Sequence, residues 1–147
     1  MESVEPSGML SIRNARLFGI IFLAYSIVLP FIILFLPKPE VSVNLGTTAL
    51  SWLMICLMPI ELLLLYAFYR YYRNKPDLDN IMGPAILMYM FATIPSIYTF
   101  VIGFTNPSLE SLAIPLGLVF SLLGFLFALR FVSNLWEKIT SSNQEQF

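Results

Sequence analysis

Residues 51–66 read SWLMICLMPIELLLLY, and Glu61 is the one charged side chain among them. The apolar run around this stretch extends from Thr48 to Tyr69. A helix needs roughly 20 such residues to cross the hydrocarbon core of a bilayer. A carboxylate deep inside a membrane helix costs about 2.5 kcal/mol or more, so it indicates either a polar partner or a function. The stretch therefore predicts a membrane-spanning helix that carries a buried acid.

Three other runs have similar length and composition. Together the four runs predict helices over Leu17–Leu36, Thr48–Tyr69, Ile81–Phe104 and Ser111–Val132. Because lipid offers no hydrogen-bond partner to the backbone, such segments must be helices rather than open strands. We expect an all-α integral membrane protein in which residues 1–147 form a single membrane domain. Short connections favour four transmembrane helices in an antiparallel up-down bundle.

The composition narrows the class of protein further. Of the 147 residues, 58% are hydrophobic and 12% are charged, whereas about 25% are charged in a typical soluble domain. The net charge of −1 gives no basic face for nucleic acid. Histidine is absent and Cys56 is the single cysteine, which removes the usual ligands of haem and transition metals. We expect no cofactor, no metal and no nucleic-acid partner, and the lipid bilayer as the surroundings.

The basic residues predict the orientation in the membrane. Seven of the eight fall on one side of the predicted spans, and only Lys38 falls on the other. The seven are Arg13, Arg16, Arg70, Arg73, Lys75, Arg130 and Lys138. Lysine and arginine concentrate in cytoplasmic loops. We therefore expect both termini inside, in a multi-pass protein of the cell membrane or of an organelle's inner membrane.

Glu61 needs a partner if it lies among the helices. Counting depth at 1.5 Å per residue from the inner ends of the predicted spans places Tyr25 and Tyr89 near its level. We expect one of these hydroxyls, or a polar group of a partner subunit, within hydrogen-bond reach. Two interpretations stay open: a structural carboxyl that joins helices, and a site that carries a proton or a cation.

Small residues form a stripe on each of the last two predicted helices. Stripes of small residues let membrane helices approach closely, so we expect these two helices to be the most tightly packed pair. The stripes consist of Ala85, Ala92, Ser96, Thr99 and Gly103 on the third helix, and Ala113, Gly117, Ser121, Gly124 and Ala128 on the fourth.

Three prolines, Pro30, Pro59 and Pro95, lie in the interior of predicted helices. Each removes a backbone hydrogen bond and can bend its helix. Both transporters and subunits that follow a curved neighbour use such bends, so the prolines do not separate these classes.

No nucleophile elbow, phosphate loop, zinc spacing or dinucleotide fingerprint is present. With no catalytic constellation in this chain, we expect it not to be an enzyme. The interpretation that the sequence favours is a non-catalytic accessory or structural subunit of a larger membrane complex, of which energy-converting complexes are one class, with other membrane subunits as partners. The alternative is a small oligomeric transporter coupled to protons or cations through Glu61.

Overall fold

The structure is a computed structural model that describes residues 7–37, 44–75 and 80–144, with side chains over 12–37, 44–75 and 80–141. Over these ranges it contains four α-helices, one short 3₁₀ turn and no strand. The elements are α1 (Ser7–Phe35), α2 (Leu45–Asn74), α3 (Met82–Thr105), the 3₁₀ turn η1 (Pro107–Leu109) and α4 (Glu110–Gln144). All four helices are long and apolar enough to cross a membrane, which confirms the all-α prediction.

Three of the helices extend well beyond the apolar runs that predicted them. α2 continues five residues past Tyr69 to Asn74, and α4 continues past Val132 to Gln144. Apolar length measures only the part of a helix that hydrocarbon can cover, whereas backbone hydrogen bonding continues into the polar surroundings. α1 likewise begins at Ser7 rather than Leu17. Lys38, the basic residue predicted for the opposite side, lies outside the described residues.

Local side chains fix where α2 and α4 begin. The Asn44 side chain accepts a hydrogen bond from the Thr47 backbone N–H at 2.9 Å, while the Thr47 hydroxyl accepts one from the Asn44 N–H at 3.1 Å. This reciprocal capping box satisfies two of the backbone donors that a helix start leaves unpaired. At the other connection, Pro107 opens the 3₁₀ turn that leads into α4, because its ring suits a first helical position.

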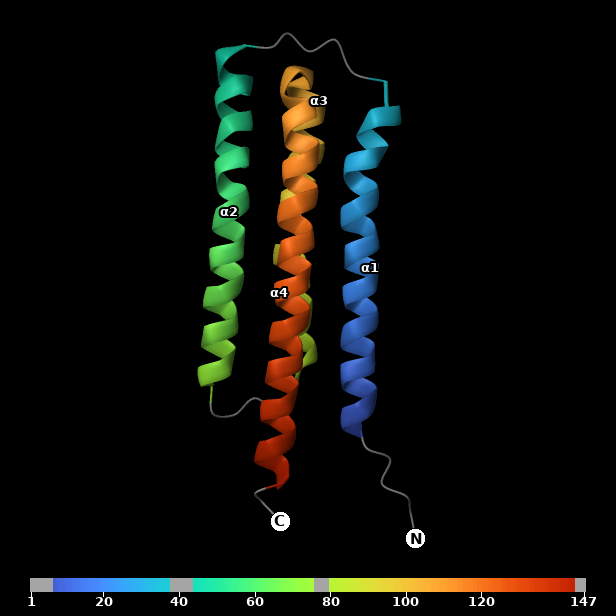
Figure 1. The fold of residues 1–147 in the computed structure, drawn as a ribbon, viewed down its shortest axis with the longest axis vertical. Helices are drawn as coiled ribbons and strands as arrows, with labels where there is room; N and C mark the ends of the chain where they lie inside the picture. Colours follow the sequence, from blue (N-terminus) through green and yellow to red (C-terminus); the bar gives the residue numbers. More distant parts are fainter. Residues whose placement is uncertain (1–6, 38–43, 76–79, 145–147) are drawn as a thin grey trace.

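The helices form a bundle in which successive elements run in opposite directions (Figure 1). α3 and α4 make the most extensive contact, and both also pack against α1 and α2. α1 and α2 lie on different flanks of this central pair and have no substantial contact with each other (Figure 1). The starts of α1 and α3 therefore lie at the same end of the bundle as the ends of α2 and α4.

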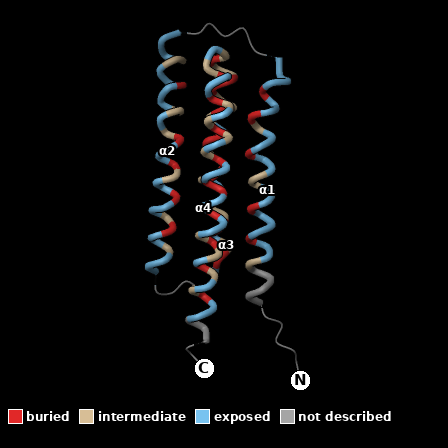
Figure 2. The backbone as a smooth tube through the Cα atoms, in the orientation of Figure 1, coloured by how far each residue is buried: buried red, intermediate tan, exposed pale blue. Residues whose placement is uncertain are grey.

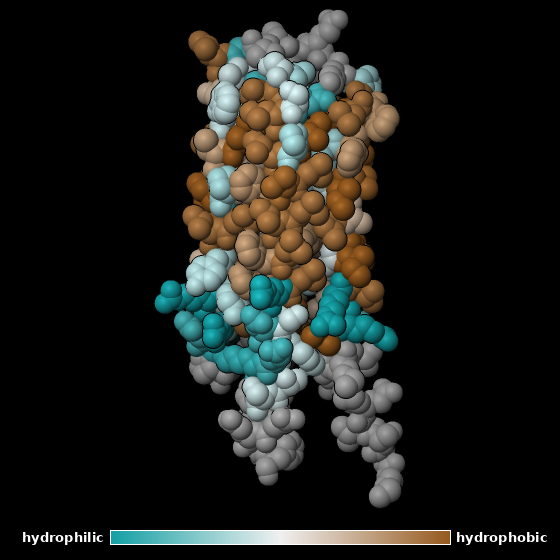
Figure 3. Space-filling model, viewed as in Figure 1, coloured by the Kyte–Doolittle hydropathy of each residue, from teal (hydrophilic) through white to brown (hydrophobic). Residues whose placement is uncertain are grey.

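Burial follows this arrangement. α3 is the most buried helix, whereas α1 and α2 present most of their surface outward (Figure 2). The outward surface is predominantly hydrophobic along the middle of the bundle, and hydrophilic side chains gather toward the end where α2 and α4 finish (Figure 3). Fully buried Met88, Tyr89 and Leu135 fill the core near that end. An apolar exterior along the middle of the bundle is what contact with the hydrocarbon of a bilayer requires.

Candidate functional site

Glu61 lies in the seam between α2 and α3. Its side chain is 7% exposed, and the Tyr98 hydroxyl donates a hydrogen bond to its Oε1 at 3.0 Å. The other carboxyl oxygen, Oε2, is buried without a hydrogen-bond partner in the described part of the chain. The acid is thus partly satisfied from within the bundle, and one acceptor remains open.

A second contact between α2 and α3 lies nearer the hydrophilic end of the bundle and fits the same alignment of the two helices as the Glu61–Tyr98 contact. The rings of Phe68 on α2 and Phe91 on α3 have centroids 4.9 Å apart. Seven residues separate Glu61 from Phe68, and seven separate Phe91 from Tyr98, which is about two helical turns on each side. The antiparallel pairing of α2 with α3 therefore brings Tyr98, and not Tyr89, to the level of Glu61.

The two tyrosines named from the sequence lie elsewhere. Tyr25 is 55% exposed on α1, and α1 has no substantial contact with α2. Tyr89 is fully buried between α1 and α4: it packs over Gly19 and lies 6.0 Å from the ring of Phe125. The depth count matched Tyr69 with Ile81 as inner ends, whereas α2 continues to Asn74. These five residues account for part of the displacement from Tyr89 to Tyr98, which is nine residues, and the other four arise because the start of α3 extends past the end of α2.

A second polar cluster joins three helices at Ser96. The Ser96 hydroxyl lies 2.8 Å from the carbonyl oxygen of Ser26 on α1 and 2.8 Å from the hydroxyl of Ser121 on α4. The Ser26 carbonyl is available because its normal helical partner would be the N–H of residue 30, and Pro30 has none. A side chain of α3 thus replaces the hydrogen bond that a proline in α1 removes.

The small residues of α3 and α4 face each other over most of their length. A Cβ at Gly117 would overlap the Thr99 hydroxyl, and one at Gly124 would lie 3.1 Å from the Ala92 Cα. The Thr99 hydroxyl lies 3.0 Å from two carbonyl oxygens, that of Pro95 on its own helix and that of Ala113 on α4, and its single proton is shared between them. These positions bring the two backbones close together, which is the arrangement expected for such stripes.

Gly103 and Ala128 lie toward opposite ends of the bundle and differ in their neighbours. A Cβ at Gly103 would overlap Ile33, so the missing side chain lets α1, rather than α4, pack closely against α3 at this position. Ala128 is fully buried in the core cluster at the hydrophilic end, together with Ala85 and Leu135. The α3 stripe therefore serves two contacts, since α3 packs against α1 as well as α4.

The described residues contain no group of three or more His, Cys, Asp or Glu side chains placed to hold a metal ion. Cys56 is exposed on the outer surface of α2. Glu61 and Tyr98 can together hold or release a proton or accept a cationic group.

Comparison with protein-family models, characterised proteins and solved structures finds no match to this chain.

Sequence reasoning missed Tyr98. A usable signal was present, because Phe91 and Tyr98 lie on one face of α3 seven residues apart, as do Glu61 and Phe68 on α2. Matching the aromatic pair would have placed the tyrosine beside the acid.

Proposed function

We propose that this chain is an integral membrane protein that crosses the bilayer four times, with the ends of α2 and α4 on the cytoplasmic side. The apolar exterior of the four helices supports membrane insertion. The excess of arginine and lysine toward one end of the bundle supports the orientation. The membrane is that of the cell or the inner membrane of an organelle.

Within that setting the chain acts as a non-catalytic accessory subunit of a larger membrane complex. The observation that carries this proposal is the use of Glu61: its carboxyl is bound by Tyr98 between two helices. Three more deeply buried hydroxyls, those of Ser96, Thr99 and Ser121, also join helices to one another. Polar side chains that form hydrogen bonds between the helices of one bundle are typical of a structural role.

Purification from the native membrane tests the subunit proposal. The tagged chain, solubilised in a mild detergent, should co-migrate with a fixed set of other membrane subunits through affinity capture, native electrophoresis and size exclusion, in constant stoichiometry. A chain that runs through all three steps as a homo-oligomer alone would contradict the proposal.

One observation favours a second candidate, a small oligomeric transporter coupled to protons or cations. Glu61 Oε2 is buried and accepts no hydrogen bond from the described residues, so the carboxyl keeps an open position for a proton or a cation. A structural role for the carboxyl accounts for Oε1, which binds Tyr98, and does not account for Oε2.

Flux into proteoliposomes decides between the two roles. The transporter requires proton or cation flux that Glu61→Gln abolishes, since glutamine cannot exchange a proton, and that Glu145→Gln leaves intact. Glu145 is the control because it is a carboxyl that follows the last residue of α4 in the sequence. Flux no greater than in protein-free liposomes, or flux indifferent to Glu61→Gln, excludes the transporter.

A further inference from the structure

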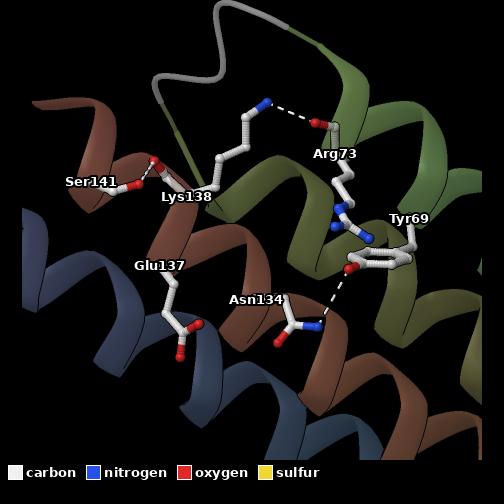
Figure 4. A pocket seen from close by; sticks show the side chains of 6 residues that line it. All are labelled: Tyr69, Arg73, Asn134, Glu137, Lys138 and Ser141. Carbon is white, nitrogen blue, oxygen red and sulfur yellow. Dashed lines mark hydrogen bonds between the residues drawn. The ribbon is translucent and has the colours of Figure 1, made fainter. Parts of the chain in front are cut away.

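A polar hollow of about 580 Å³ lies between the ends of α2 and α4 (Figure 4). It is lined by Tyr69, Arg73, Asn134, Glu137, Lys138 and Ser141. The hollow belongs to the end of the bundle where the hydrophobic exterior gives way to charged side chains (Figure 3). Its size falls in the range of about 300–1,000 Å³ that is usual for small-molecule sites.

The walls of the hollow are held in place by contacts between α2 and α4. The Tyr69 ring stacks on Phe131 with centroids 4.0 Å apart, and its hydroxyl accepts a hydrogen bond from Asn134 Nδ2 at 3.3 Å. The Lys138 ammonium donates to the carbonyl oxygens of Arg73 and Lys75, each at 2.7 Å. Since that ammonium binds carbonyl oxygens at and just after the last turn of α2, it joins the ends of the two helices.

Two of the three charged side chains that line the hollow, Arg73 and Glu137, have opposite charges and do not pair with each other. The Arg73 guanidinium lies 6.0 Å from the centre of the Tyr69 ring. Glu137 reaches into the same hollow from α4, yet Figure 4 shows its carboxylate turned away from the guanidinium. Across the described ranges, no ion pair joins Arg73 to an acidic side chain. A second hollow of about 410 Å³ shares Tyr69 and Arg73 and adds Arg70 to the cationic wall.

We propose that this hollow binds the headgroup of a zwitterionic phospholipid, with the phosphate at Arg73 and the headgroup amine at Glu137. A guanidinium can contact two phosphate oxygens at once, and a carboxylate is the matching partner for an ammonium. Tyrosines concentrate at headgroup level, and basic pockets between membrane helices on the cytoplasmic side bind lipid headgroups. The inference requires the membrane orientation above, but it holds for a subunit and for a transporter alike.

Glu137 should make the site prefer headgroups that carry an amine, in addition to contacting that amine. A headgroup that carries an amine satisfies both charges, whereas an anionic headgroup without an amine leaves the carboxylate facing a second negative charge. Phosphatidylethanolamine should therefore bind better than phosphatidylglycerol.

Native mass spectrometry of the purified full chain in detergent micelles tests the site. The probes are phosphatidylethanolamine, phosphatidylglycerol and inorganic phosphate, each titrated at equal concentrations. Arg73→Gln should weaken binding of phosphatidylethanolamine about tenfold, the scale of one charge-assisted contact. Arg13→Gln is the matched control: it removes an exposed arginine on α1, outside the hollow, and should leave binding unchanged. Glu137→Gln should abolish the preference for phosphatidylethanolamine over phosphatidylglycerol.

Three results would overturn the proposal. Equal losses of lipid binding in Arg73→Gln and Arg13→Gln would mean that the lipid is attracted by the overall positive charge of this end of the bundle and not by the hollow. Displacement of the lipid by inorganic phosphate at equal concentration would mean a site for a free anion. An unchanged preference in Glu137→Gln would remove the amine contact. If circular dichroism shows that Arg73→Gln does not fold, Arg73→Lys replaces it, because lysine keeps the charge but cannot make the two-oxygen contact and should still bind several-fold more weakly.

Discussion

Ser121 donates the hydrogen bond that joins its hydroxyl to that of Ser96. The two oxygens lie 2.8 Å apart, and either could be the donor by geometry alone. Ser96, however, directs its single hydroxyl proton to the carbonyl oxygen of Ser26, which can only accept. A directed chain of hydrogen bonds therefore runs from α4 through α3 to α1, and Ser96 is the one residue that takes part in both links.

Removing Ser96 should consequently cost more than removing Ser121. Ser96→Ala loses both links and leaves the Ser26 carbonyl without a partner, which should lower the free energy of unfolding by about 1–2 kcal/mol. Ser121→Ala loses one link and should cost about half as much. Equilibrium unfolding in mixed micelles measures both, with Ser133→Ala as the control, since Ser133 bonds only within its own helix. Equal effects for Ser96 and Ser121 would contradict the directed chain.

Gly117→Ala should weaken the contact between α3 and α4. The added methyl would overlap the Thr99 hydroxyl and lie 3.0 Å from the backbone oxygen of Pro95, which cannot move aside as a flexible side chain can. We expect destabilisation by about 1–3 kcal/mol, the scale of overpacking. Gly83→Ala is the control, because a Cβ there meets nothing within 4 Å and should be neutral or stabilising. The same unfolding measurement applies, and a stabilised Gly117→Ala would show that the helices have room to spare.

Tyr98→Phe should destabilise the protein, whereas Tyr25→Phe should not. The first change removes the hydrogen bond to Glu61 and leaves a buried carboxyl without that donor, at a cost of about 1–3 kcal/mol. The second removes a hydroxyl from a side chain that is 55% exposed. Combining Tyr98→Phe with Glu61→Leu should cost less than the sum of the two single changes, because the carboxyl is then gone as well. Strictly additive losses would mean that the two side chains do not interact.

The orientation proposed for the membrane can be tested by cysteine labelling on a Cys56→Ala background. A cysteine at Asn74, on the exposed end of α2, should react with a membrane-impermeant maleimide only after the cytoplasmic side is opened. One at Ser108, in the exposed turn between α3 and α4, should react from outside in intact cells. The reverse pattern would invert the orientation, and labelling of both positions from one side would reject the up-down crossing.

The sequence was sufficient to predict four long apolar helices because hydrophobic length is a local property. It was not sufficient to pair them. The register of α2 against α3 depends on how far α2 continues into polar surroundings. The apolar run ends at Tyr69, whereas the helix ends at Asn74. The Ser96 link depended on another non-local fact, namely which helix presents the carbonyl freed by Pro30. Gly103 was expected to face α4, whereas it faces α1. The positions of small residues along one helix do not reveal which of two neighbouring helices they contact.

The lack of substantial contact between α1 and α2 has a consequence for assembly. Each of these helices docks on the α3–α4 pair through contacts that do not involve the other, so neither needs the other to be in place. A split version, with α1 expressed as one polypeptide and α2 to α4 as another, should therefore reassemble in the membrane, and the hairpin of α3 and α4 should be the part that forms first.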